Sequence, residues 1–78
     1  MTESYIKIEM IVKKPKTEVY NIKNKNSGDI LGIVKWYSSW KQYCFFPKHS
    51  TIFNKDCMNE IIDFINTLME KKEVNYIE

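Results

Sequence analysis

Aromatic rings, ammonium groups and small hydroxyls gather in one stretch near the middle of the chain. The stretch runs from Lys35 to Tyr43 and contains both tryptophans of the sequence. Flat π-surfaces suit stacking on a nucleobase, and neighbouring lysines suit a phosphate. The residues of the stretch are therefore the candidate ligand-binding site: Lys35, Trp36, Tyr37, Ser38, Ser39, Trp40, Lys41, Gln42 and Tyr43.

The two tryptophans are the expected stacking residues. Trp36 and Trp40 flank a predicted turn, and this placement suits the bracketing of a flat ring. The alternative for each ring is that a large aromatic side chain fills the core of a small protein. This alternative applies most to Trp36, because it follows Val34 in an alternating segment. The sequence leaves open whether Trp36 faces the core or a ligand.

Charged and polar groups of the same stretch have complementary roles. Lys35 and Lys41 would supply positive charge for a phosphate at both ends of the turn. The backbone N–H groups around Ser38 and Ser39 would form a nest for the anion. Three side chains that donate and accept hydrogen bonds would select base edges or ribose: Tyr37, Gln42 and Tyr43.

Catalytic and metal-binding residues show no recognisable arrangement in the sequence. Cys44 alternates with aromatic residues and Cys57 lies on an apolar helical stripe, so both are expected to be structural thiols. His49 is a single loop histidine, which does not give a metal site with known spacing. With Gly28 and Gly32 as its two glycines, the chain has no glycine-rich phosphate loop. We therefore expect a binding protein and not an enzyme, with no cofactor and no metal.

Length and composition favour a small cytoplasmic protein that associates with itself. A chain of 78 residues forms one domain, residues 1–78, and buries only about 60% of its unfolded surface. We expect no signal peptide and no membrane-spanning segment, because the N-terminal residues and the apolar runs of this sequence are too short for either, and reduced cysteines are expected in turn. Self-association then remains as the stabilising device. The net charge is +2 and arginine is absent, which argues against a sequence-reading DNA-binding protein.

Four alternating or β-branched segments predict strands, at about 5–12, 17–23, 30–37 and 41–46. The turn from Asn24 to Asp29 separates the second and third strands, and Pro47 ends the fourth. Gly32 is expected to mark a bulge or the close approach of another backbone. Because the connections are short, we expect a four-stranded antiparallel meander.

A C-terminal amphipathic helix is predicted over about residues 55–72, followed by a frayed tail at 73–78. Asn54 is the expected N-cap. The apolar stripe is wider than a surface helix needs, and its residues are Cys57, Met58, Ile61, Ile62, Phe64, Ile65, Leu68 and Met69. The opposite face, which includes Glu60, is expected to be solvated. The predicted fold is thus α+β, with the helix packed on one face of the sheet and the other face exposed.

The sequence around the candidate site also resembles a family of small phage proteins. Residues Leu31 to Pro47, LGIVKWYSSWKQYCFFP, resemble a pattern L-G-x-I-[KR]-W-[YF]-x-x-W-[KR]-Q-Y-C-F-F-P. Three flanking segments extend the resemblance: KTEVY at 16–20, TIFN at 51–54 and CMNEIIDFI at 57–65. The resemblance covers about residues 16–70. Lysine stands at positions 35 and 41, where arginine is frequent in the family pattern, which weakens any bidentate phosphate contact.

The resemblance implies an anti-defence function. The family is associated with anti-CBASS sponge proteins, phage oligomers that sequester cyclic nucleotide immune signals such as cyclic GMP-AMP without cleaving them. Related sponges bind cyclic ADP-ribose derivatives made by Thoeris. For this chain the resemblance implies a homodimer or homotetramer in the cytoplasm of the infected host, with a cyclic dinucleotide or related signal held near subunit interfaces.

Two other functions remain open on sequence grounds. Stacking aromatics on a basic sheet also serve single-stranded nucleic-acid-binding proteins. An exposed aromatic patch also serves protein–protein inhibitors of a host factor. The identity and linkage of the nucleotide, the stoichiometry and the defence system are not determined by the sequence.

Overall fold

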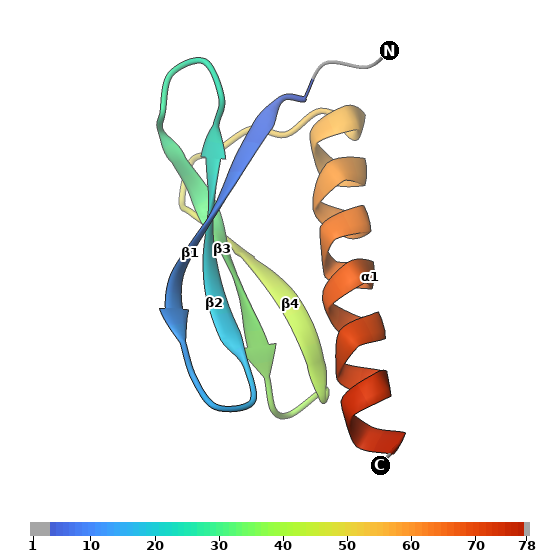
Figure 1. Ribbon diagram of the computed structural model, residues 1–78. Coiled ribbons are helices and arrows are strands. Elements are labelled where there is room, and N and C mark those ends of the chain that lie inside the picture. Colours follow the sequence, from blue (N-terminus) through green and yellow to red (C-terminus); the bar gives the residue numbers. More distant parts are fainter. Residues whose placement is uncertain (1–3, 78) are drawn as a thin grey trace.

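The computed structural model describes residues 4–77, and the side chains of residues 4–71. Four antiparallel strands form one sheet in the order β1-β2-β3-β4. A C-terminal helix packs against this sheet (Figure 1), which confirms the predicted α+β meander. The elements are β1 (Ile6–Lys13), β2 (Glu18–Asn24), β3 (Ile30–Tyr37), β4 (Gln42–Pro47) and α1 (Lys55–Ile77).

Strand positions agree closely with the prediction, whereas the end of the helix does not. The third strand has the predicted bounds, and the others are shifted slightly toward the C-terminus. The prediction ended the helix at residue 72, but α1 continues to Ile77. The expectation of a frayed tail is therefore wrong for residues 73–77, and Glu78 lies outside the described residues. No proline or glycine interrupts this segment, so nothing local stops the helix.

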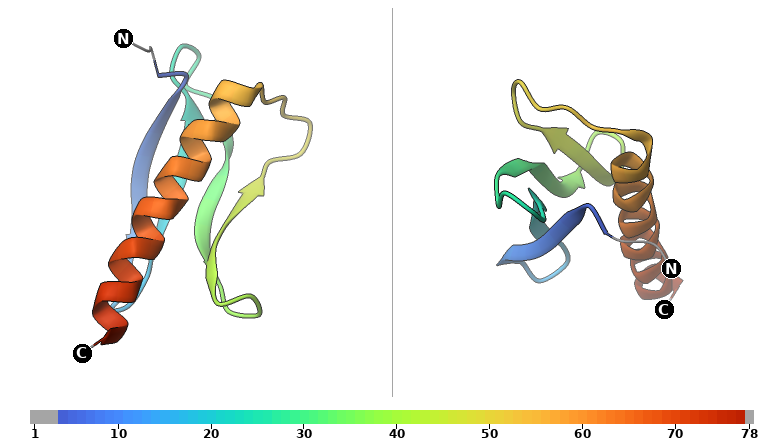
Figure 2. Two further views of the ribbon diagram at one scale, coloured as in Figure 1. Left: turned by 90° about the vertical axis from the view of Figure 1, so that its right-hand side faces the viewer. Right: turned by 90° about the horizontal axis from the view of Figure 1, so that it is seen from above.

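Alternation along the strands gives the sheet two different faces. The side that we call the covered face packs against α1, which runs diagonally across it in Figure 2. On the other side, which we call the open face, no helix lies within residues 4–77. Fully or nearly buried side chains from the strands and α1 form the core between them: Ile6, Ile22, Leu31, Val34, Tyr43, Ile61 and Leu68.

Polar side chains hold the N-terminal part of α1 in place. The Cys57 N–H donates to Asn54 Oδ1 at 2.7 Å, so Asn54 is the N-cap, as predicted. Glu60 differs from the prediction of a solvated carboxylate. Its Oε2 accepts the Tyr5 N–H at 2.9 Å, and its Oε1 lies 2.6 Å from Ser4 Oγ. Glu60 thereby ties α1 to the start of β1.

Gly32 lies where the backbone of β4 and an aromatic ring approach β3 closely. A Cβ atom at this position would lie 2.5 Å from the Phe46 carbonyl oxygen and 2.7 Å from the Phe45 ring. The predicted close approach is therefore confirmed. The pairing of β2 with β3 also shifts register between Ile22 and Lys23, so a bulge lies beside this glycine.

Candidate binding surface

The hairpin between β3 and β4 carries the candidate site. Ser38, Ser39, Trp40 and Lys41 form its exposed loop, and Lys41 has a positive φ of 55°. The N–H groups of Trp40 and Lys41 both donate to the Tyr37 carbonyl, at 3.2 and 2.9 Å. These two groups are therefore used inside the turn, and the expected anion nest does not include them.

The structure does not bring the nine candidate residues together on one surface. Strand alternation places Lys35, Tyr37 and Gln42 on the open face, where Lys35 pairs with Cys44 and Tyr37 with Gln42. Trp36 and Tyr43 pair with each other across the strands and face the opposite side. The two tryptophans consequently lie on different sides of the sheet and cannot bracket one ring.

Trp36 and Tyr43 belong to the covered face. Tyr43 is 3% exposed and is part of the core, whereas Trp36 is half-buried and packs against that core. Their rings meet edge to face, with centroids 5.5 Å apart. Of the two alternatives that the sequence left open for Trp36, the structure therefore shows packing against the core. Tyr43 was expected to contact a ligand, but its burial in the core is inconsistent with that role.

Three rings and one ammonium group form a continuous surface on the open face. The Tyr37 ring meets the Trp40 ring edge to face at 5.2 Å and the Phe46 ring at 6.0 Å. Lys35 Nζ lies 4.9 Å from the centroid of the Phe46 ring. We call these four residues the aromatic platform: Lys35, Tyr37, Trp40 and Phe46. Because Trp40 is 67% exposed, its indole offers most of its surface to solvent.

Phe46 is the residue of the platform that lies outside the candidate segment from Lys35 to Tyr43. A consistent period of two assigns Phe46 to the same face as Cys44 and Gln42, and that period was available in the sequence. Its register partner is Ile33, another residue of the open face. The signal was masked because Phe45 and Phe46 are adjacent and equally apolar.

A polar cluster on the covered side explains the buried hydroxyl of Tyr43. Tyr43 Oη donates to Glu18 Oε1 at 3.3 Å, and Tyr20 Oη donates to the same oxygen at 3.3 Å. Tyr43 Oη also accepts the Glu18 N–H at 3.2 Å. Burial raises the pKa of both phenols above its usual value, and the nearby Glu18 carboxylate raises it further. The cluster is a packing device, with both phenols kept neutral.

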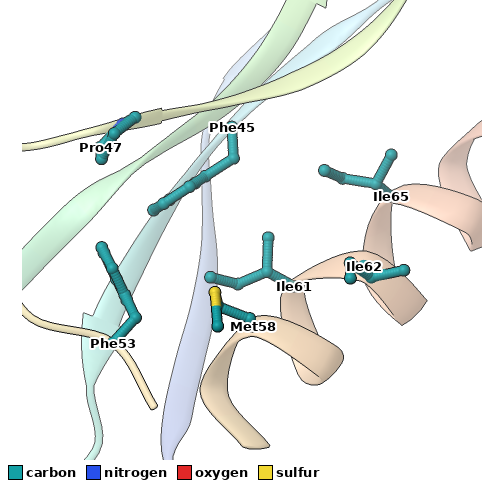
Figure 3. A pocket seen from close by; sticks show the side chains of 7 residues that line it. All are labelled: Phe45, Pro47, Phe53, Met58, Ile61, Ile62 and Ile65. Atoms are coloured by element: carbon teal, nitrogen blue, oxygen red, sulfur yellow. The ribbon is translucent and has the colours of Figure 1, made fainter. Parts of the chain in front are cut away.

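A separate apolar pocket opens between β4, the loop after it and α1 (Figure 3). Its volume is about 300 Å³, at the lower end of ligand pockets. The lining is entirely apolar: Phe45, Pro47, Phe53, Met58, Ile61, Ile62 and Ile65. The predicted excess of apolar helix surface accounts for this pocket in part, since Met58 and Ile62 stay 48% and 52% exposed at its rim.

Metal-binding clusters and membrane-spanning helices are not found in the described part of the chain. Across residues 4–71, histidine, cysteine, aspartate and glutamate side chains do not gather in groups of three or more that would suit a metal ion. Within the described residues, no helix combines the length and apolar character needed to cross a bilayer. Cys44 and Cys57 are free thiols, and both are half-buried.

Comparison with known proteins relates the chain to a bacteriophage protein. No protein-family model matches it, and no solved structure matches it. It is 34% identical over 64 residues to the uncharacterized 9.3 kDa protein of Acholeplasma phage L2. The match covers 80% of this chain and 82% of the phage protein. The chain therefore belongs to the same family as this small phage protein.

Proposed function

We propose that the chain is a phage anti-defence sponge, which binds a cyclic nucleotide immune signal on the aromatic platform and holds it without cleaving it. The observation that carries this proposal is the exposed indole of Trp40, which the Tyr37 ring contacts edge to face. An exposed indole held in place by a second ring is suited to stacking on a nucleobase. The relative is a phage protein, and an anti-defence role would require a phage origin.

Charge beside the platform suits the phosphates of such a signal. Lys35 is exposed and lies over the Phe46 ring, and Lys41 is exposed in the hairpin loop next to Trp40. Lysine acts on phosphate as a point charge and does not make a bidentate contact. The exposed hydroxyls of Ser38 and Ser39, together with the Gln42 amide, add donors near the same loop.

A second candidate function is the binding of single-stranded nucleic acid. The observation that favours it is the shape of the platform, because Trp40, Tyr37 and Phe46 follow one another across an uncovered sheet face. Successive bases of a strand stack on such a series of rings. A linear decrease of log affinity with log salt concentration would be the signature of that function.

The test compares ligands of both classes on the full chain. The protein is incubated with a panel of cyclic dinucleotides, cyclic ADP-ribose derivatives and short oligonucleotides, and affinities are measured by calorimetry. Any retained ligand is released by heat and identified by mass spectrometry. We expect a cyclic nucleotide to be retained and recovered intact. Recovery of a hydrolysed product, or binding of oligonucleotides alone, would contradict the proposed sponge.

Trp40→Ala tests the site itself. Loss of one stacked base costs about 1–3 kcal/mol of binding free energy, so affinity should fall by roughly 5- to 150-fold. Tyr5→Ala is the matched control, since Tyr5 is also an exposed ring but lies away from the platform on the N-terminal side of β1. Circular dichroism should show both variants folded. Unchanged affinity in Trp40→Ala would remove the platform from the proposal.

A further inference from the structure

The two edge strands of the sheet, β4 and β1, differ in their contacts with the helix. On the β4 edge, the Tyr43 N–H donates to Met69 Sδ at 3.3 Å, and β4 is the strand that α1 contacts most. Within the described part of the chain, no helix runs along the β1 edge, and in Figure 1 no described segment lies in front of this strand. A strand with unpaired backbone groups is a template for pairing with another chain.

Hydrogen bonds around the strand show which groups of β1 point outward. The Lys25 N–H donates to the Tyr5 carbonyl at 3.1 Å, so the backbone of Tyr5 faces β2. Backbone direction alternates along a strand, so Lys7 and Glu9 also face β2, with Lys23 and Asn21 as their register partners. The N–H and C=O groups of the remaining residues, Ile6, Ile8 and Met10, therefore point to the outer edge.

Among the described residues, few groups form hydrogen bonds with the outward backbone of β1. Ser4 Oγ lies 2.8 Å from the Ile6 carbonyl oxygen, which provides for one group at the start of the strand. Among residues 4–71, no hydrogen bond reaches the outward groups of Ile8 and Met10. The side chain of Met10 is 51% exposed, and Ile8 is half-buried. The edge thus combines unpaired backbone with apolar side chains that would gain from a neighbouring strand.

Charges on β1 select one register in which the strand complements itself. In an antiparallel pair of identical strands, outward-facing residues must pair with outward-facing residues. A two-fold axis at Ile8 pairs Ile8 with its own copy, Ile6 with Met10, and Lys7 with Glu9 in both directions. An axis opposite Lys7 or Glu9 places that residue beside its own copy, so two like charges face each other. An axis at Met10 falls beside the bulge between Met10 and Val12, which interrupts the regular alternation that the pairing needs.

We propose that β1 is a self-recognition edge, at which a second copy of this chain adds antiparallel to β1 with the two-fold axis at Ile8. The pairing continues the sheet across the axis. It places two Lys7–Glu9 pairs on the open face, where Glu9 already forms an ion pair with Lys23 at 2.8 Å. On the covered face, Ile8 meets its copy and Met10 meets Ile6, so the core is extended by apolar cross-strand pairs.

This inference does not depend on the proposed nucleotide function. The aromatic platform lies on β3 and β4, at the far side of the sheet from β1. With strands spaced about 4.8 Å apart, the two platforms of the paired molecule would lie about 30 Å from each other. Each platform therefore acts alone. A variant that no longer pairs should still bind ligand, and its failure to pair would not count against the proposed function.

Charge reversal on the edge tests the register. The self-association of the full chain is measured by analytical ultracentrifugation over a concentration series, for the wild type, Lys7→Glu and Glu9→Lys. Both side chains are exposed, so both variants should fold. Each variant places like charges opposite each other twice per dimer, and we expect association to weaken at least about tenfold. Lys25→Glu, at an exposed turn residue, is the control for Lys7→Glu, because both variants change the net charge by the same amount.

An equimolar mixture of the two edge variants gives the decisive measurement. In the mixed pair, the carboxylate introduced at position 7 faces the ammonium introduced at position 9, and the native Glu9 faces the native Lys7. We expect the mixture to recover association that neither variant shows alone. A wild type that stays monomeric throughout the series would overturn the proposal. Association that is unchanged in both variants would also overturn it, because the pairing would then lie elsewhere.

Discussion

The covered and open faces of the sheet use the same residue types for different purposes. On the covered face, Trp36 and Tyr43 meet edge to face and are absorbed into the packing beneath α1. On the open face, Tyr37 and Trp40 form an equally close pair, yet both rings remain exposed. Ring contact alone therefore does not distinguish a core from a binding surface. The presence or absence of the helix decides it.

The largest difference between the faces should appear in the cost of truncating one isoleucine on each. Ile22, which is 0% exposed, lies in the core of the covered face, and Ile33 is half-buried on the open face. Ile22→Ala leaves a cavity in a packed core and should lower the free energy of unfolding by about 2–5 kcal/mol. Ile33→Ala should cost about 1 kcal/mol. Urea denaturation of both variants measures the difference.

Equal costs for the two variants would contradict the distinction between the faces. A domain of this length has little stability to lose, so Ile22→Ala is expected to be largely unfolded near its working temperature. Ile22→Val and Ile33→Val, which each remove one methylene, then provide the measurement, with an expected cost of about 0.5–1.5 kcal/mol for Ile22→Val and a smaller cost for Ile33→Val. A cost for Ile33→Ala above that of Ile22→Ala would indicate that the open face is buried in solution, for example by a partner.

A smaller effect is expected from adding one methyl group at Gly32, on the covered side of β3. The added Cβ would meet the Phe46 carbonyl oxygen and the Phe45 ring, and Phe45 is a wall of the apolar pocket. We expect Gly32→Ala to cost about 1–3 kcal/mol, because the backbone of β4 cannot yield as a flexible side chain would. Thermal unfolding monitored by circular dichroism measures this cost.

Gly28 is the matched control for that substitution. It has a positive φ of 79°, and no atom lies within 4 Å of an added Cβ. Gly28→Asn keeps a residue that accepts the left-handed conformation, so its cost should stay below about 1 kcal/mol. A cost for Gly32→Ala as small as that for Gly28→Asn would show that β3 and β4 separate more easily than their close approach indicates.

Most of the fold was accessible from the sequence because local signals agreed with one another. Alternation, turn residues and the Asn54 cap each predict the observed element, and Gly28 and Gly32 lie where a turn and a close approach require glycine. The end of α1 was missed because the last residues of a chain commonly fray, and residues 73–78 lie at the C-terminus. The role of Glu60 was missed because its partners, Ser4 and Tyr5, are remote in sequence.

The sequence singled out the segment that carries the candidate site but not the division of its residues between the two faces. Composition identified the segment, and the exposed Trp40 supports that choice. The division follows from strand register, which places Trp36 opposite Tyr43 and Tyr37 opposite Gln42. An alternating pattern predicts that successive residues of a strand lie on opposite faces of the sheet, but it does not show which face the helix covers. Only tertiary packing supplies that information.

The smallest expected effect on stability concerns one tyrosine on each face, Tyr43 on the covered face and Tyr37 on the open face. Tyr43→Phe removes a buried hydroxyl that contacts Glu18, and it should cost about 0.5–1.5 kcal/mol of stability at neutral pH. Tyr37→Phe removes a hydroxyl from an exposed ring, and its cost should stay within about 0.5 kcal/mol. Urea denaturation at neutral pH gives both values.

Alkaline pH then isolates the contribution of burial. Because the pKa of Tyr43 is raised in the folded state, the unfolded chain releases this proton at a lower pH than the folded chain does. The contribution of the neutral phenol is therefore complete below a pH of about 10 and is lost as the pH rises through the folded-state pKa. Tyr43→Phe should reduce the slope of stability against pH above that point, and Tyr20 should account for part of the slope that remains. An unchanged slope in Tyr43→Phe would mean that its hydroxyl reaches water in solution, and Tyr43 would then have to be returned to the surface that contacts ligands.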